Sequence, residues 1–135
     1  RRFVFLGAAR DRALAEATIR RLTQVLPNHR YENRCGEMSL MESLSELARA
    51  SEFWGVDSAL LHYARIFGVR CVSYWGPTDP RTRLKPVAGL EEEVEYRKIP
   101  CSPCIHLAEK APCGGNNLCI KNLFSPAGDE PEWPL

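Results

Sequence analysis

The sequence has no long hydrophobic run and no excess of charge of one sign. Nowhere in its 135 residues do about eighteen apolar residues follow one another, so no membrane-spanning helix is expected. The 18 basic and 17 acidic residues nearly cancel, which argues against a nucleic-acid-binding protein. The start, Arg1 to Val4, also lacks an initiator Met and the apolar stretch of a signal peptide, as expected of a piece cut from a longer chain.

What the chain does have is 44% hydrophobic residues, enough for the core of one domain, in an alternation of short apolar runs and helical periodicity. The S-x-x-E sequence at Ser39 and Glu42 predicts a capping box, and Gly68 is placed to end a helix. The expected strands are residues 3–6, one short strand within 29–37, 51–56, 69–75 and 94–99, and the expected helices are 11–26, 39–50 and 59–67. This order predicts an α/β fold, a Rossmann-like parallel sheet with helices on both faces.

In such sheets ligands bind where the strands end, which directs attention to the loops 7–11, 56–60 and 76–80. Asp57 and Ser58 stand at a helix start, where free amides and the helix dipole favour an anion such as phosphate, and His62 follows one turn later. Asp57 and Ser58 are also ordinary capping residues, and a lone histidine is often only packed. The chain has neither a G-x-S-x-G nor a G-x-G-x-x-G sequence.

Three stretches together resemble a known family. Met38-Ser39-Leu40, the run Asp57-Ser58-Ala59-Leu60-Leu61-His62-Tyr63-Ala64, and Tyr74-Trp75-Gly76-Pro77-Thr78-Asp79-Pro80 resemble the C-terminal half of glycosyltransferase family 9, the ADP-heptose heptosyltransferases. The resemblance covers roughly residues 3–122 and implies one lobe of a GT-B fold, the lobe that binds the nucleotide-sugar donor. It implies transfer of heptose from ADP-heptose to an acceptor hydroxyl of lipopolysaccharide core or of a protein.

The resemblance also assigns roles to residues of the donor site. It places Asp11 on the ribose hydroxyls and Met38 near the adenine. Asp57, Ser58 and the amide of Ala59 would surround the diphosphate, with His62 close by; the family has Gly at the position of Ala59. We expect Thr78 and Asp79 to shape the turn after their strand.

In the family, the acceptor lobe, the catalytic base and a phosphate-binding Lys precede the segment that this chain resembles. We therefore expect no catalytic residue within the 135 residues and no turnover by the chain alone, because the rate depends on holding acceptor and donor together. A bacterial cytoplasmic location, at the inner face of the membrane or away from it, is implied as well. The alternative function is a non-catalytic nucleotide-binding or metal-stabilised interaction module.

Four of the six cysteines crowd into one stretch with the spacing C-x2-C-x8-C-x5-C, formed by Cys101, Cys104, Cys113 and Cys119. Four thiolates can complete a tetrahedral site for zinc or iron, and metal would supply folding energy to a stretch with few apolar residues. Disulfides, free thiols and a thioredoxin-like redox centre are the alternatives. The tail resembles that of the autotransporter-heptosyltransferase branch of the family, which implies iron.

The predicted organisation is thus a donor-binding lobe over residues 1–99, a four-cysteine segment over 100–122 and a tail over 123–135. His106 lies close enough in sequence to compete as a metal ligand. Cys71, inside an apolar strand, is expected to be a small buried residue.

Overall fold

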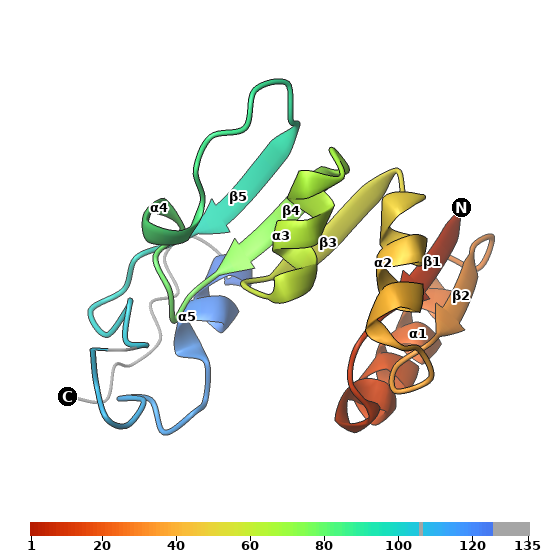
Figure 1. Cartoon of the computed structure of the whole chain (residues 1–135). Helices are drawn as coiled ribbons and strands as arrows, with labels where there is room; N and C mark the ends of the chain where they lie inside the picture. The colour runs from red at the N-terminus through yellow and green to blue at the C-terminus, as the bar shows by residue number, and fades with distance from the viewer. Residues whose placement is uncertain (106, 126–135) are drawn as a thin grey trace. The chain divides into compact units, whose positions relative to one another are not determined.

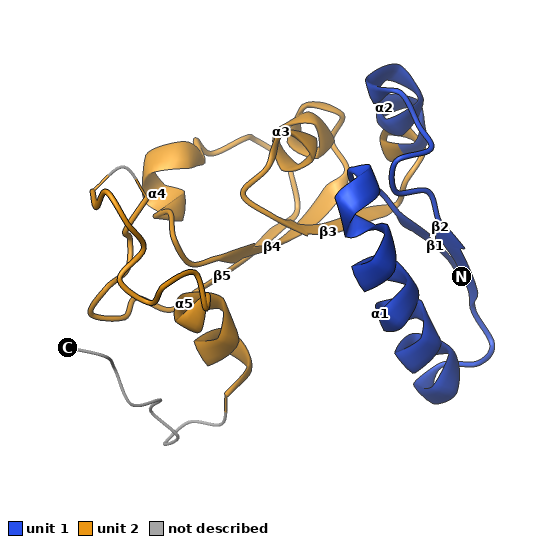
Figure 2. Ribbon diagram, turned by 90° about the horizontal axis from the view of Figure 1, so that it is seen from below, with its two compact units in different colours: residues 1–46 blue, residues 47–135 orange. Residues whose placement is uncertain are grey.

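The structure is a computed structural model and describes residues 1–105 and 107–125 (Figure 1). The chain divides into two compact units, residues 1–46 and residues 47–135 (Figure 2). His106 and residues 126–135, which include most of the predicted tail, lie outside the described residues. The predicted boundaries at residues 99 and 122 remain predictions.

The first unit is built on two parallel strands, β1 (Arg2–Phe5) and β2 (Arg30–Asn33), which pair from Arg2 with Arg30 to Phe5 with Asn33. The 3-10 turn η1 (Ala9–Asp11) and helix α1 (Arg12–Val25) connect them. A parallel pair needs such a crossover because the chain must return to the starting edge. Helix α2 (Leu40–Ala48) then begins and runs across the boundary between the units.

The second unit holds a three-stranded parallel sheet in the order β3 (Glu52–Val56), β4 (Arg70–Trp75) and β5 (Glu92–Tyr96). The core gathers around the central strand β4, where Trp75 is 1% exposed, and around helix α3 (Ala59–Ile66), where Leu61 and Ala64 are completely buried. The short helices α4 (Pro80–Arg83) and α5 (Leu118–Lys121) and the 3-10 turn η2 (Asn122–Phe124) complete the unit.

The predicted elements are present with boundaries shifted by a few residues. Gly68 has the positive φ of 72° expected of a residue that ends a helix, and Cys71 is buried as predicted. Strand β5 begins two residues earlier than predicted, in an acidic stretch whose carboxylates find partners: Arg65 binds Glu92 and Arg70 binds Glu93. Pairing with arginine allows these acidic residues to lie in a strand.

The α/β character with parallel sheets is confirmed, and it is consistent with a GT-B lobe. The prediction of one sheet is not matched by the pairing of the described residues, whose hydrogen bonds form a sheet of two strands and a sheet of three. A continuous sheet through residues 1–99 would require a further strand pair between the two.

Candidate functional site

The junction of β3 and α3 is the helix start that the sequence singled out. Ser58 is the N-cap residue, with extended backbone, and its Oγ accepts a hydrogen bond from the amide of Leu61 at 3.5 Å. Ala59 is the first helical residue and is exposed, so its methyl group displaces nothing inside the unit. The amides of the first turn have no acceptor further back in the helix, which leaves this end suited to an anion.

Asp57 and His62 lie together at this junction. His62 Nε2 is 3.6 Å from Asp57 Oδ1, and the side chains are 41% and 27% exposed. Both side chains of the pair are therefore partly accessible to solvent. The helical spacing that places His62 one turn after Ser58 accounts for this meeting.

Thr78, which the sequence suggested only shapes a turn, belongs to the same cluster. Its hydroxyl Oγ1 donates a hydrogen bond to Asp57 Oδ2 at 2.9 Å, and the residue is 7% exposed. One carboxylate oxygen of Asp57 thus binds Thr78 while the other faces His62. The sequence offered only a hint of this contact, since Thr78 follows β4 and Asp57 follows the neighbouring parallel strand.

Asp79, in contrast, has the turn-shaping role predicted for it. It caps α4 by accepting from the amide of Arg81 at 2.9 Å, and its carboxylate also binds the Arg81 guanidinium, with Nη2 at 2.6 Å from Oδ2. The hydrogen bond from the Arg81 side chain lowers the pKa of Asp79 below its ordinary value. Asp79 is therefore ionised at neutral pH, and its carboxylate is already bound to Arg81.

In the first unit, Asp11 closes the turn that follows β1. Its Oδ2 accepts from the amide of Ala8 at 2.9 Å, and a Cβ added to Gly7 would lie 2.9 Å from the same oxygen. Gly7 thus leaves room for the carboxylate. Oδ1 is 4.0 Å from Nε of the exposed Arg10, and the Asp11 side chain is 49% exposed, so one oxygen remains open to a ligand.

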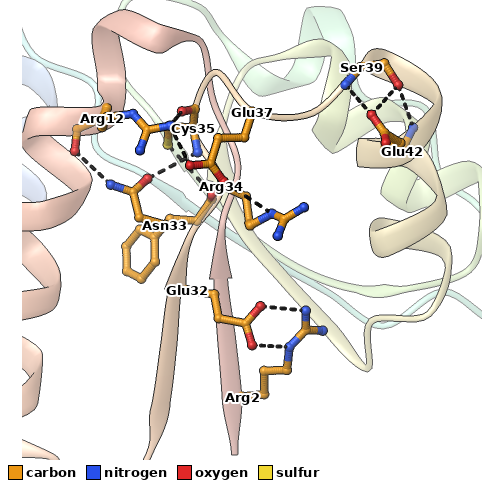
Figure 3. A network of polar contacts seen from close by, with 10 residues as sticks. Arg2, Arg12, Glu32, Asn33, Arg34, Cys35, Glu37, Ser39 and Glu42 are labelled. Carbon is orange, nitrogen blue, oxygen red and sulfur yellow. Dashed lines mark hydrogen bonds and ion pairs between the residues drawn. The ribbon is translucent and has the colours of Figure 1, made fainter.

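A polar network that sequence reasoning missed joins the start of α1 to the end of β2 and the loop that follows it (Figure 3). Arg12 donates to the carbonyl of Cys35 at 2.9 Å and to Glu37 Oε1 at 2.8 Å. Asn33 donates to the carbonyl of Arg12 at 3.0 Å and accepts from the amide of Cys35 at 3.1 Å. Gly36, with φ of 72°, packs so closely on Ala9 that a Cβ would lie 2.6 Å from its Cα.

Met38 is half-buried and lies two residues before the start of α2. The capping box predicted there is present: Ser39 donates from its amide and its hydroxyl to Glu42 Oε2, at 2.8 and 2.7 Å, and accepts from the Glu42 amide at 3.3 Å. Its hydroxyl is the first cause that lowers the pKa of Glu42. Met38 is thus followed by a well-defined helix start.

The four-cysteine segment contains thiols that influence one another. All four are free; burial, followed by the charges of Cys101 and Cys113, raises the pKa of the Cys104 thiol. Burial also raises the pKa of Cys119, with Cys104 and Cys113 among the further causes. Cys113 differs: burial acts to raise its pKa, but hydrogen bonds from the backbone amides of residues 115–118 lower it overall.

A turn of amides around a sulfur favours the thiolate, the form that binds metal. Within residues 1–105 and 107–125, however, no three His, Cys, Asp or Glu side chains are arranged to hold a metal ion. Four cysteine thiols are suitable ligands for a metal, but their sulfur atoms are not arranged around a common point as in a metal site. Metal binding by this segment is therefore a proposal.

The segment is also tied to the site loop. The amides of Cys104 and Ile105 both donate to the carbonyl of Pro77, each at 3.0 Å, and the buried Ser102 hydroxyl donates to the carbonyl of Gly76. These contacts bring residues about 25 positions apart together beside Thr78.

The family model described as Glycosyltransferase family 9 (heptosyltransferase) matches residues 2–113, most of the chain. The searches of curated proteins and of solved structures found no match to the chain. In the part of the chain that the structure describes, no helix has the length and apolar character to cross a membrane.

Proposed function

The chain belongs to glycosyltransferase family 9, and from this premise we propose that it binds the nucleotide-sugar donor of a glycosyl transfer, with ADP-heptose as that donor. The observation that carries the proposal is the cluster of Asp57, His62 and Thr78 beside the capped start of α3. Both the family match and the helix start support this proposal, because a nucleotide-sugar donor carries a diphosphate and the exposed start of a helix is suited to bind an anion.

In the proposed mechanism, an acceptor hydroxyl attacks the anomeric carbon, the bond from that carbon to the β-phosphate oxygen breaks and ADP leaves, and the hydroxyl proton passes to the catalytic base of the acceptor lobe. Negative charge grows on the leaving group, and the amides at the start of α3 together with His62 stabilise it. Asp57 acts through His62 rather than by touching phosphate, because a carboxylate and a diphosphate repel each other. Ser58 keeps the helix start in its capped conformation.

The nucleoside contacts are proposed from the first unit. Asp11 has an open carboxylate oxygen, and a carboxylate is a suitable acceptor for the two hydroxyls of a ribose. Met38 offers a half-buried thioether for the adenine. The acceptor, a lipopolysaccharide sugar or a protein hydroxyl, and the catalytic base are proposed to belong to an acceptor lobe outside these residues, in the bacterial cytoplasm.

Titration calorimetry with ADP tests the donor site. Asp57→Asn should weaken ADP binding about tenfold, since it removes the carboxylate charge that lies 3.6 Å from His62 Nε2 at the helix start. The matched control Glu109→Gln changes an exposed carboxylate of the same unit and should leave binding unaltered. Absence of heat and of a thermal shift with millimolar ADP would reject the donor site and favour the interaction-module alternative.

For the four-cysteine segment we propose structural iron or zinc held by Cys101, Cys104, Cys113 and Cys119. The backbone amides that lower the pKa of the Cys113 thiol support this, because metal ligands are deprotonated thiols. Metal analysis of the purified protein should give close to one equivalent. Less than about half an equivalent, with four thiols titrating as free, would reject the site.

A further inference from the structure

The side chain of Asp57, which precedes the N-cap of α3, is held by a residue of another loop. Thr78 is almost fully buried, and its hydroxyl reaches Asp57 Oδ2 at 2.9 Å. With that oxygen engaged, the carboxylate is oriented with Oδ1 toward His62. The orientation of Asp57 therefore depends on where the loop after β4 places Thr78.

That loop is in turn held by the four-cysteine segment. The carbonyl of Pro77, one residue before Thr78, accepts both the Cys104 and the Ile105 amide. The hydroxyl of Ser102, which is 4% exposed, donates to the carbonyl of Gly76. Three donors from residues 102–105 thus fix two consecutive peptide groups of the loop.

Close packing adds to these hydrogen bonds. A Cβ built on Gly76 would lie 2.6 Å from Cys119 Sγ and 2.9 Å from Ile120 Cδ1, so α5 touches the loop backbone directly. The loop lies against two parts of the segment, the turn at residues 102–105 and helix α5. A displacement of either part would move the peptide that carries Thr78.

From these contacts we propose that Thr78 is a positioning residue for Asp57, and that residues 102–105 and Cys119 position Thr78. The four-cysteine segment thereby supports the anion site as well as its own fold. This inference rests on the proposed function only in that Asp57 and His62 are taken to serve the donor.

The first test compares Thr78→Val with Thr78→Ser by ADP calorimetry. Valine keeps the shape and removes the hydroxyl, and should weaken ADP binding about tenfold, the cost of a hydrogen bond to a charged group. Serine keeps the hydroxyl and should restore affinity to within about threefold of the unaltered protein. Equal affinities for the Val and Ser variants would overturn the role of Thr78.

The second test removes a contact remote from Asp57. Ser102→Ala should weaken ADP binding, whereas the control Ser125→Ala, which removes a hydroxyl bound to the carbonyl of Lys121 just beyond the end of the segment, should not. Equal effects of Ser102→Ala and Ser125→Ala would show that the segment does not position the loop.

A readout without ligand separates this inference from the proposed function. The NMR signal of the Asp57 side-chain carboxyl carbon should shift in Thr78→Val and Ser102→Ala and stay in place in Ser125→Ala. Should ADP fail to bind even the unaltered protein, the donor site is rejected while these shifts still test the positioning. An unmoved signal in both Thr78→Val and Ser102→Ala overturns the positioning, whatever the melting temperatures.

Discussion

Asp11 uses its two carboxylate oxygens differently, which makes its proposed role testable. Oδ2 accepts from the Ala8 amide, and an asparagine oxygen can make the same hydrogen bond, so Asp11→Asn should keep the turn. The charge that we propose to face the ribose is lost, and ADP should bind about tenfold more weakly while pyrophosphate changes by less than about threefold. Calorimetry with both ligands measures this, with Glu16→Gln on the exposed face of α1 as control; equal losses for the two ligands contradict the ribose assignment.

Gly76 packs against Cys119, and this contact predicts how a substitution at Gly76 affects stability. Gly76→Ala places a methyl group against Cys119 Sγ and should lower the free energy of unfolding by about 1–3 kcal/mol, the usual cost of overpacking. Chemical denaturation with chelator and reductant present measures it.

The companion variant for Gly76 removes the sulfur that the new methyl group meets. In the double variant Gly76→Ala with Cys119→Ala, the loss should be smaller than the sum of the single losses by about 1 kcal/mol, because the two residues are in contact. Strict additivity would show that the methyl group is accommodated elsewhere, for example by a shift of Ile120.

At the scale of elements, Arg65 joins α3 to β5. Its guanidinium donates to Glu92 Oε2 at 2.5 Å and Oε1 at 3.1 Å and to the carbonyl of Lys85 at 2.5 Å, with the side chain 8% exposed. Arg65→Ala leaves Glu92 without its buried partner and should cost about 3 kcal/mol of unfolding free energy.

Arg70 provides the matched control for that measurement. It pairs with Glu52, Glu91 and Glu93 from a side chain that is 40% exposed, and exposed ion pairs contribute at most about 1 kcal/mol. Urea denaturation should therefore separate Arg70→Ala from Arg65→Ala clearly. Similar losses for both would mean that the Arg65 contacts are no stronger than surface pairs.

Helix starts could be predicted from the sequence where the residues that form them lie within a few positions of one another. The capping box of Ser39 and Glu42 spans one helical turn, and the spacing of Asp57, Ser58 and His62 lies within one helix start. Contacts between loops were not predictable in this way. The bond from Thr78 to Asp57 and those from residues 102–105 to Pro77 depend on which strands neighbour each other and on how an irregular segment returns, which no periodicity encodes.

At the scale of the whole molecule, several carboxylates have pKa values below their ordinary range because they hydrogen-bond to other side chains. The first cause is Arg2 for Glu32, Arg12 for Glu37, Ser39 for Glu42 and Arg81 for Asp79. A lowered pKa means that the folded chain binds fewer protons than the unfolded chain at acid pH. These groups add stability above their ordinary values, 4.5 for Glu and 3.8 for Asp, and lose it as the pH falls through the lower folded values.

The urea concentration at the unfolding midpoint should accordingly decrease as the pH is lowered from about 6 to about 3. Added salt should make this decrease smaller, because all four groups are near the surface. A variant with Glu37→Gln and Asp79→Asn should show a shallower dependence on pH. An unchanged midpoint across the range would contradict the contribution of these pairs.

The carbonyl of Pro77 has a consequence for sugar selectivity. A peptide oxygen has two lone pairs, and in this loop both are taken by the amides of Cys104 and Ile105. A sugar hydroxyl that approaches Pro77 would find no acceptor there. If the chain binds the nucleotide sugar as proposed, recognition of a sugar hydroxyl at this loop must therefore use groups other than the Pro77 carbonyl, and a substitution aimed at that carbonyl should not change which sugar is bound.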